Sequence, residues 1–235
     1  MARVAVFGMG YVGCVTAGCL SQDGHSVVGV DVDPAKVKEI LSGQSPISEP
    51  GLSEIVAQQV AAGQLTATDN VTEAVAKTDI ALIAVGTPSA SDGSVALAGV
   101  EAVVRSIGKA IHAAPKPYCV VIRSTLLPGI LEEKLAPVLY GELGTHGALV
   151  KIYNNPEFLR ESSAVKDYYQ PPYILVGTVD NADPAPVFDL YRSVNAEQLV
   201  SDTRTASLVK YACNAYHAVK ISFANEIGTL AQALG

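Results

Sequence analysis

The sequence has little of what marks a membrane protein or a nucleic-acid-binding protein. Its longest apolar runs, such as IALIAV at 80–85, are far shorter than the roughly 20 residues that a membrane-spanning helix needs. No block of Lys and Arg offsets the formal net charge of −7, which argues against nucleic acid or an anionic membrane as a partner. The N-terminus lacks the basic, apolar and cleavage regions of a signal peptide, so we expect a soluble, cytoplasmic protein.

The cysteines also lack the pattern of a disulfide framework or a metal site. No CxxC pair and no histidine at metal-ligand spacing accompanies Cys14, Cys19, Cys119 and Cys213. Reduced, partly buried thiols of a cytosolic protein explain them better than disulfides or zinc do. We therefore expect no metal.

The sequence is rich in apolar residues, and short strand-like runs alternate along it with helix-like segments. Hydrophobic residues make up 49% of the 235 residues and charged residues 17%, which allows a sizeable core. Apolar runs without alternation indicate strands covered on both faces, as in a parallel sheet. Strands are expected at 3–8, 26–31, 65–68, 80–85 and 119–123, with helices between them at 12–22, 34–43, 53–62, 70–77 and 97–113. This order predicts an α/β, Rossmann-like, doubly wound fold with a mainly parallel sheet.

The pattern changes after about Pro128. Strands are expected at 150–154, 173–177 and 197–200, and helices at 130–140 and 184–194. The polar stretch NPEFLRESSAVKDY at 155–168 carries no predicted element. From Asp202, a good helix N-cap, helical signals continue almost to the last residue, which indicates a long helix that bridges to something further on.

The glycines of GMGYVG form a GxGxxG placed directly between the first strand and the first helix. Gly8 would allow a tight turn, Gly10 a close approach of a pyrophosphate, and Gly13 close packing of helix and strand. The N–H groups at the helix start would then face the diphosphate. The alternative, a turn that merely needs small residues, fits this context less well.

Asp31 ends the second strand, where a carboxylate can accept hydrogen bonds from both ribose hydroxyls and repel a 2′-phosphate. The sequence therefore predicts NAD rather than NADP as the cofactor. Asp33 is expected to cap the helix that begins at Pro34. Lys36 could reach the adenosine ribose or be an ordinary surface lysine. At two later strand ends, Thr87 and Thr125 could face the cofactor or a water, or could cap helices; both alternatives stay open.

The stretch from 210 to 226 is expected to be one helix with two distinct faces. A sector about 80° wide carries the polar side chains of Lys210, Asn214, His217 and Asn225. The opposite side carries apolar residues, among them Tyr216, Val219 and Phe223. A solvent-facing stripe is the ordinary explanation, but two amides and an imidazole are unusual for such a face.

Six motifs of this sequence, in their order and spacing, resemble those of the nucleotide-sugar 6-dehydrogenases, a family that includes UDP-glucose and GDP-mannose dehydrogenases. The motifs are GMGYVG, SPISEPGL, GTPS, RSTLLPG, NPEFLRES and KYACNAYHAVKISFANEIG. The resemblance implies NAD-dependent four-electron oxidation of a sugar C6 hydroxymethyl to a carboxylate, through a cysteine-bound thiohemiacetal and thioester. NPEFLRESSAVKDY and His217 look most like the GDP-mannose branch, with UDP-glucose as the alternative substrate.

The resemblance also implies roles for individual residues. Positions that match NAD contacts are Tyr11, Val12, Asp31, Lys36, Thr87 and Thr125. Positions that match contacts to the sugar nucleotide or the reacting centre are Glu161, Lys210, Asn214, His217 and Asn225. Glu157 matches the carboxylate that activates water for thioester hydrolysis, with Thr125 holding that water. Lys210 and Asn214 lie one turn apart, so both could point at one developing alkoxide on C6.

In the family, the nucleophilic cysteine follows the bridging helix, and none of the four cysteines here can replace it. We therefore expect a fragment in which 1–200 is an NAD-binding domain and 201–235 starts a central helical domain that forms a homodimer. A two-electron dehydrogenase of the hydroxyacid or 6-phosphogluconate type is one alternative, against which NPEFLRE argues. The other alternative is an NAD-binding module without catalysis.

Overall fold

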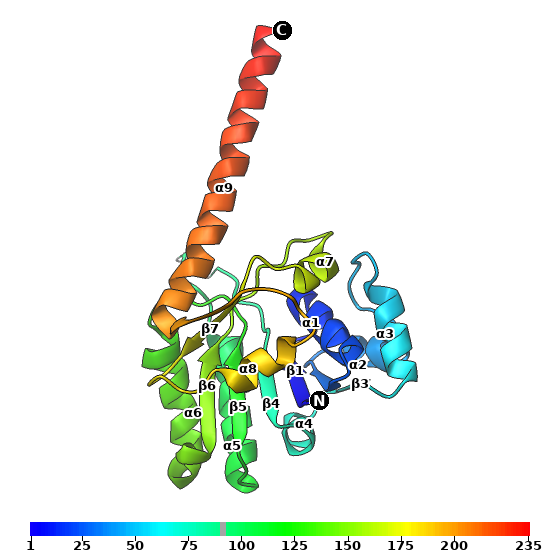
Figure 1. Ribbon diagram of the computed structural model, residues 1–235, viewed down its shortest axis with the longest axis vertical. Coiled ribbons are helices and arrows are strands. Elements are labelled where there is room, and N and C mark those ends of the chain that lie inside the picture. Colours follow the sequence, from blue (N-terminus) through cyan, green and yellow to red (C-terminus); the bar gives the residue numbers. More distant parts are fainter. Residues whose placement is uncertain (90–92) are drawn as a thin grey trace.

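The computed structural model describes residues 1–89 and 93–235, and its centre is an eight-stranded sheet in the order β3-β2-β1-β4-β5-β6-β7-β8 (Figure 1). The strands are β1 (Arg3–Phe7), β2 (Ser26–Val30), β3 (Leu65–Thr68), β4 (Ile80–Ile83), β5 (Tyr118–Ile122), β6 (Val150–Asn154), β7 (Ile174–Thr178) and β8 (Gln198–Asp202). Strands β1 to β6 are parallel, β7 is antiparallel to β6, and β8 is parallel to β7. This is the Rossmann order with a two-stranded addition, so the predicted fold class is confirmed.

Helices cover both faces of the sheet. One layer comprises α1 (Tyr11–Gln22), α2 (Pro34–Leu41), α3 (Leu52–Ala61), α7 (Ala164–Tyr169), α8 (Ala185–Phe188) and the 3₁₀ turn Asp189–Tyr191. The other comprises α4 (Val71–Lys77), α5 (Ala98–Ala113), the π-helical turn Leu131–Leu135 and α6 (Ala136–Leu143), which leads through a 3₁₀ segment, Gly144–Leu149, into β6. Successive β1 residues alternate between the two cores, Val4 and Val6 in one, Ala5 and Phe7 in the other. This alternation explains the continuous apolar runs.

Three predicted segments differ from the structure. The polar stretch at 155–168 contains all but the last residue of α7, whose six residues are too few to show a helical period in the sequence. The helix expected at 184–194 is split into α8 and a 3₁₀ turn. The helix expected at 130–140 begins with a π-helical turn before it continues as α6.

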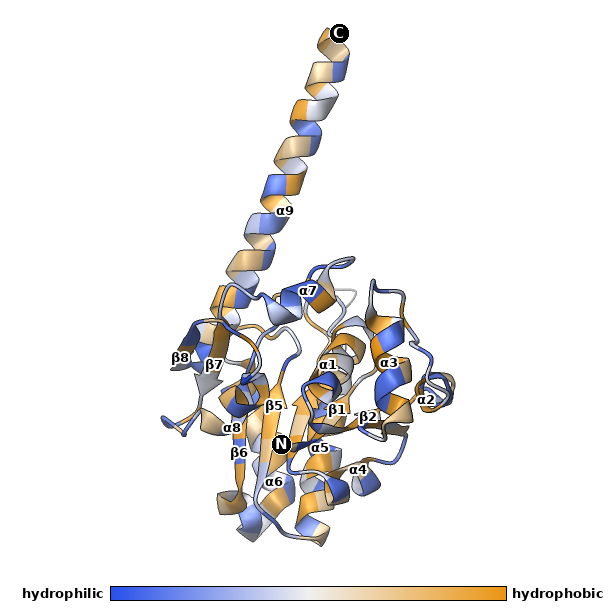
Figure 2. Cartoon of the chain, turned by 45° about the vertical axis from the view of Figure 1, so that its right-hand side comes forward, coloured by the Kyte–Doolittle hydropathy of each residue, from blue (hydrophilic) through white to orange (hydrophobic). Residues whose placement is uncertain are grey.

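The last helix, α9 (Thr203–Leu234), packs on the sheet only at its start. Asp202 caps it as predicted, accepting the Thr205 N–H at 2.8 Å. From residue 212 onward every residue is exposed, because the helix leaves the sheet and projects from the α/β body, as Figure 1 and Figure 2 show. Cys213 is exposed for the same reason, so the expectation of partly buried thiols is wrong for it. Within the described residues, no helix is long and apolar enough to span a membrane.

Candidate active site

The glycine-rich turn lies at the carboxyl end of β1, beside β4, where the strand order reverses. Gly8 has a φ of +92°, and a Cβ there would lie 2.9 Å from the Ala84 carbonyl oxygen. At Gly13 a Cβ would lie 1.7 Å from the Gly8 carbonyl oxygen. Only glycine fits either position, for the two reasons that the motif predicts: a tight turn and close packing of α1 on β1.

A cleft of about 420 Å³ opens beside this turn. Its size is that of a small-molecule site, and its lining includes Gly8, Gly10, Asp31 and Lys36 together with apolar side chains. A Cβ on Gly10 would meet no atom within 4 Å, so it would project into space that a phosphate could occupy. Helix α1 begins there without a side-chain cap, which leaves its first N–H groups for an anion. These features fit a dinucleotide.

Asp31 is 9% exposed and already supports the turn. Its Oδ2 accepts the Met9 N–H at 2.6 Å and its Oδ1 accepts the Asp33 N–H at 2.9 Å. A carboxylate has about four acceptor sites, so capacity remains for ribose hydroxyls. The Lys36 ammonium lies 3.5 Å from Asp31 Oδ2, and Lys36 lines the cleft. This position favours a contact with the adenosine ribose over the role of an ordinary surface lysine. Asp33 caps α2 as predicted, accepting the Ala35 N–H at 2.9 Å.

The two strand-end threonines lie together but outside the lining of this cleft. The Thr87 hydroxyl donates to the Thr125 carbonyl at 3.1 Å. Neither threonine caps a helix, since α5 begins after Leu97 and the π-helical turn after Ile130, so the capping alternative is wrong. Ser124 strengthens the same junction by donating to the Val85 carbonyl at 2.6 Å. The carboxyl ends of β4 and β5 are thereby held together.

Lys210 meets Glu157 at the carboxyl end of β6. The Lys210 Nζ lies 2.7 Å from Glu157 Oε1, and their side chains are only 7% and 11% exposed. The second carboxylate oxygen accepts the Leu159 N–H at 2.6 Å. The ammonium also lies 5.6 Å from the centre of the Phe158 ring, within cation–π range. The structure therefore brings together two of the residues that the sequence assigned to the reaction.

Packing of α9 on the sheet produces this meeting. The Asn154 amide, at the end of β6, donates to Ser207 Oγ at 2.8 Å. Gly177 of β7 lets α9 approach closely, because a Cβ there would lie 2.8 Å from that of Ala206. Ser207 lies one turn before Lys210, and Asn154 lies three residues before Glu157. These contacts set the helix so that Lys210 faces the loop that carries Glu157, residues 155–163.

The other residues assigned to the sugar nucleotide do not lie beside the Lys210–Glu157 pair. Asn214, His217 and Asn225 are exposed on the projecting part of α9, and Glu161 is exposed in its loop. The His217 imidazole is thus exposed rather than buried in a substrate site, because no described element covers the helix beyond its first turns.

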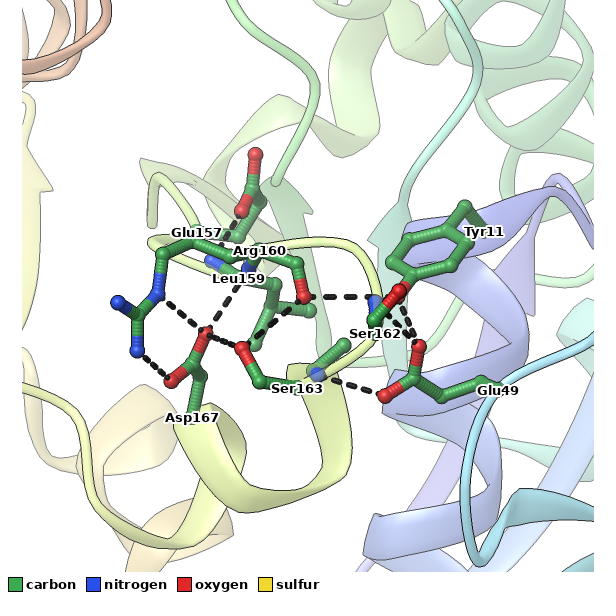
Figure 3. A network of polar contacts seen from close by, with 9 residues as sticks. Tyr11, Glu49, Glu157, Leu159, Arg160, Ser162, Ser163 and Asp167 are labelled. Carbon is green, nitrogen blue, oxygen red and sulfur yellow. Dashed lines mark hydrogen bonds and ion pairs between the residues drawn. The ribbon is translucent and has the colours of Figure 1, made fainter. Parts of the chain in front are cut away.

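Sequence reasoning missed a buried carboxylate, Glu49, in the loop before α3 (Figure 3). It accepts hydrogen bonds from the Tyr11 hydroxyl, from the Ser162 N–H at 3.0 Å and from the Ala164 N–H at 2.7 Å. Burial, and then the bond to Glu49, raises the pKa of Tyr11 to about 12, so the phenol stays a donor at neutral pH. The only signal was a lone acidic residue between Ile47 and Pro50 in SPISEPGL.

The fold and the cleft define a dinucleotide-binding protein of the Rossmann type, and comparisons with known proteins narrow the class. Residues 2–195 match the NAD binding domain of the UDP-glucose/GDP-mannose dehydrogenase family, and residues 204–235 match its central domain. The chain belongs to the UDP-glucose/GDP-mannose dehydrogenase family.

Three relatives illustrate the similarity. The GDP-mannose 6-dehydrogenase of Azotobacter vinelandii is 44% identical over 234 residues, which are 99% of this chain and 54% of the relative. The crystal structure of a ternary complex of GDP-mannose dehydrogenase from Pseudomonas aeruginosa has a TM-score of 0.95 at 42% identity, covering 99% of this chain and 54% of that one. A UDP-glucose dehydrogenase from Pyrobaculum islandicum has a TM-score of 0.92 at 43% identity, covering 97% and 52%. The chain thus spans about half the length of the curated relatives that it matches.

Proposed function

We propose that this chain is the cofactor-binding part of an NAD-dependent nucleotide-sugar 6-dehydrogenase that oxidises GDP-mannose to GDP-mannuronate. The observation that carries the proposal is the buried Lys210–Glu157 pair. It lies at the same edge of the sheet as the dinucleotide cleft, because β1 to β6 run parallel and both sites follow strand ends. An ammonium and a carboxylate on the same sheet edge as a cofactor cleft suit an oxidation followed by a hydrolysis.

The cofactor would be held by residues from three segments. The turn Gly8 to Gly13 and the α1 N–H groups, including those of Tyr11 and Val12, would bind the pyrophosphate. Asp31 and Lys36 would bind the adenosine ribose, and Thr87 with Thr125 would line the path toward the nicotinamide. When bound, NAD supplies the hydride acceptor for each oxidation.

The chain's own side chains would do the rest. Lys210 uses one of its three N–H donors on Glu157, which leaves two for the C6 oxygen as negative charge develops on it. Asn214 would orient the same oxygen. Glu157 would take the proton from the water that hydrolyses the thioester, with Thr125 holding that water. Glu161, His217 and Asn225 would contact the sugar nucleotide.

We also propose that residues 1–200 form the NAD-binding domain and that 201–235 begin a central helical domain through which two copies associate. Support comes from the large apolar side chains that stay exposed along α9, among them Tyr216, Val219, Phe223, Ile227 and Leu230. Sedimentation of the chain should show dimers that Phe223→Asp with Leu230→Asp converts to monomers. A parent that is monomeric at every concentration would count against this interface.

UDP-glucose is the second candidate substrate, because a UDP-glucose dehydrogenase is as similar in sequence to this chain as a GDP-mannose dehydrogenase is, at 43% and 42% identity. A chain of the relatives' full length, supplied with NAD and each nucleotide sugar, separates the possibilities. The proposal predicts two NADH per sugar and a higher kcat/KM for GDP-mannose. A higher value for UDP-glucose would reverse the substrate assignment. One NADH per substrate would indicate a two-electron dehydrogenase, and NAD binding without any NADH a non-catalytic module.

The 235-residue chain itself is the control for this assay. We expect it to bind NAD without sustained release of NADH from either nucleotide sugar. Burial raises the pKa of Cys14 and Cys19 to about 12, which leaves both thiols protonated and unreactive at neutral pH. Sustained release of two NADH per sugar would show that one of the four cysteines acts as the nucleophile.

A further inference from the structure

Glu49 joins two segments that are far apart in the sequence. One is the start of α1, which carries the dinucleotide turn and contributes the Tyr11 hydroxyl. The other is the acidic loop, residues 155–163, together with the first residue of α7, which contribute the N–H groups of Ser162 and Ala164. Figure 3 shows that one carboxylate oxygen, Oε2, faces both Tyr11 and Ser162, whereas Oε1 accepts the Ala164 N–H. Glu49 itself is 5% exposed.

The site requires a carboxylate rather than an amide. All three groups that face Glu49 donate hydrogen bonds, and an ionised carboxylate is the side chain that only accepts. In a glutamine, the amide NH₂ would point at one of those donors. A buried donor would then lose its acceptor, which is more damaging than loss of an exposed hydrogen bond.

The backbone at the contact is in an unfavourable conformation. Ser162 has a φ of 69°, in the left-handed region that non-glycine residues seldom adopt. Its N–H donates to Glu49 and lies 3.0 Å from the Tyr11 hydroxyl oxygen. Such a conformation persists where the surroundings hold it, and here the holding groups are Glu49 and Tyr11.

A second anchor, independent of Glu49, acts within the loop. Arg160 donates through Nε and Nη2 to both oxygens of Asp167, at 3.0 and 2.7 Å, and its N–H donates to Asp167 Oδ2 at 3.0 Å. Asp167 belongs to α7, so this pair closes the loop on its own helix. It does not reach α1. The Tyr11 hydroxyl also reaches the loop directly, 3.4 Å from the Arg160 carbonyl oxygen, and Tyr169 of α7 bonds to Gln22 at the far end of α1. At the dinucleotide turn itself, Glu49 is the charged group that joins the loop to the start of α1.

We propose that Glu49 is a positioning residue, which fixes the loop that carries Glu157 and Glu161 against the helix that carries the dinucleotide turn. Its catalytic meaning rests on the proposed function, because only that function makes Glu157 a reacting group. Glu49 does not line the cofactor cleft and has no bond to Lys210 among the described contacts, so it acts through the loop. Its loss should release the Ser162 end of the loop from α1 and leave both the Arg160–Asp167 anchor and the cofactor cleft intact.

Hydrogen exchange of single backbone amides in this chain tests the bridge directly. In Glu49→Gln we expect the amide that faces the new NH₂ group, Ser162 or Ala164, to exchange about tenfold faster or more, the scale of one lost hydrogen bond. The Arg160 amide, which is bonded to Asp167, should be unchanged, as should the affinity for NAD. The matched control is Glu54→Gln, which removes the same charge from an exposed position in the first turn of α3. Unchanged protection at Ser162 and Ala164, or a parallel loss of NAD affinity, would overturn the proposal.

If Glu49→Gln does not fold, Glu49→Asp keeps the charge and shortens the reach, and the same two amides should lose protection by a smaller factor. Turnover in a chain of the relatives' full length gives a second readout. Glu49→Gln should lower kcat about tenfold or more with the KM for NAD unchanged, the pattern expected when only the reacting loop is displaced. An unchanged kcat would overturn the proposal. A parent that oxidises no nucleotide sugar would refute the proposed function, whereas the exchange experiment would still decide whether Glu49 positions the loop.

Discussion

At the scale of single residues, the Lys210–Glu157 pair combines stability with reactivity. Both charges are largely removed from water, which is unfavourable unless each finds its partner and further hydrogen bonds. Here the carboxylate also accepts the Leu159 N–H, and the ammonium faces the Phe158 ring. The pair is therefore held while two N–H donors of the ammonium stay available, which suits the role proposed for Lys210.

A double-mutant cycle tests this coupling. Lys210→Met or Glu157→Gln alone should destabilise the chain by about 3 kcal/mol, because each leaves a buried group without its partner. The double variant should lose less than the sum of the two. Urea unfolding measures all three, and Lys220→Met, at an exposed position of α9, should change stability by less than about 0.5 kcal/mol. Additive losses would mean that the two side chains do not interact in solution.

His25 makes folding depend on pH. Its Nδ1 accepts the Ala2 N–H at 3.0 Å and its Nε2 lies 3.2 Å from the Leu190 carbonyl oxygen, so a neutral ring protonated on Nε2 satisfies both. Burial is the main cause that lowers the pKa of His25, and it outweighs the hydrogen bond to the Leu190 carbonyl, which raises it; the N-terminal amine and Arg192 lower the pKa further, and Asp23 raises it. The unfolded chain therefore binds this proton at a higher pH than the folded chain does.

The sign of the pH dependence follows. The contribution of His25 is fully present above its ordinary pKa of about 6.5 and is lost as the pH falls from there toward the lowered folded-state value. Melting temperatures between about pH 8 and about pH 5 should fall more steeply for the parent than for His25→Gln, which cannot titrate. If the melting temperatures of the parent and His25→Gln fall equally with pH, another group causes the loss of stability in acid.

At the scale of secondary-structure elements, the junction of α9 with β7 decides where Lys210 lies. Gly177→Ala should destabilise the chain by about 1–3 kcal/mol, since the new methyl would meet the Ala206 Cβ at 2.8 Å and the Thr203 Cα at 2.9 Å. The matched control is Gly141→Ala in α6, where a Cβ meets nothing within 4 Å. That change should stabilise by about 0.5–1 kcal/mol through helix propensity. Thermal unfolding of both variants checks the contrast, and equal effects would contradict close packing at Gly177.

Secondary-structure elements and local motifs could be predicted where all the residues that determine the conformation lie in one short stretch of sequence. The positive φ at Gly8, the Asp33 cap and the Asp202 cap are of this kind, because each depends on residues within one turn. Contacts that depend on distant packing could not be predicted from spacing. Glu49 meets Ser162 only after β6 and α7 have formed, and no periodicity marks such a residue.

The polar face of α9, which carries Lys210, Asn214, His217 and Asn225, is a second case in which sequence spacing did not predict burial. Helical spacing correctly placed Lys210 and His217 on one face, yet only Lys210 lies against the sheet. Burial is set by what covers a helix, and a helical wheel carries no information on that. The apolar opposite face, for example Phe223 at 66% exposure, likewise has no cover among the described residues.

At the scale of the whole molecule, the parallel sheet places two sites along one edge. The cleft near β1 and β4 lies toward one side, and the Lys210–Glu157 pair lies after β6. The Thr87–Thr125 contact, after β4 and β5, lies between them in strand order. A dinucleotide held by Gly10 and Asp31 would thus extend along the edge toward the pair, which is the arrangement that hydride transfer from a bound sugar requires.

The proposed function depends on NAD in the cleft beside Asp31, so calorimetric titration of the chain with NAD and with NADP tests that function most directly. We predict one NAD per chain and affinity for NADP lower by about tenfold or more, because the Asp31 carboxylate repels a 2′-phosphate. Asp31→Ala should weaken NAD by about 1–3 kcal/mol, with a thermal melt to confirm that the turn still folds without its acceptor for Met9. Equal affinities for NAD and NADP in the parent, or no binding of either, would contradict the account.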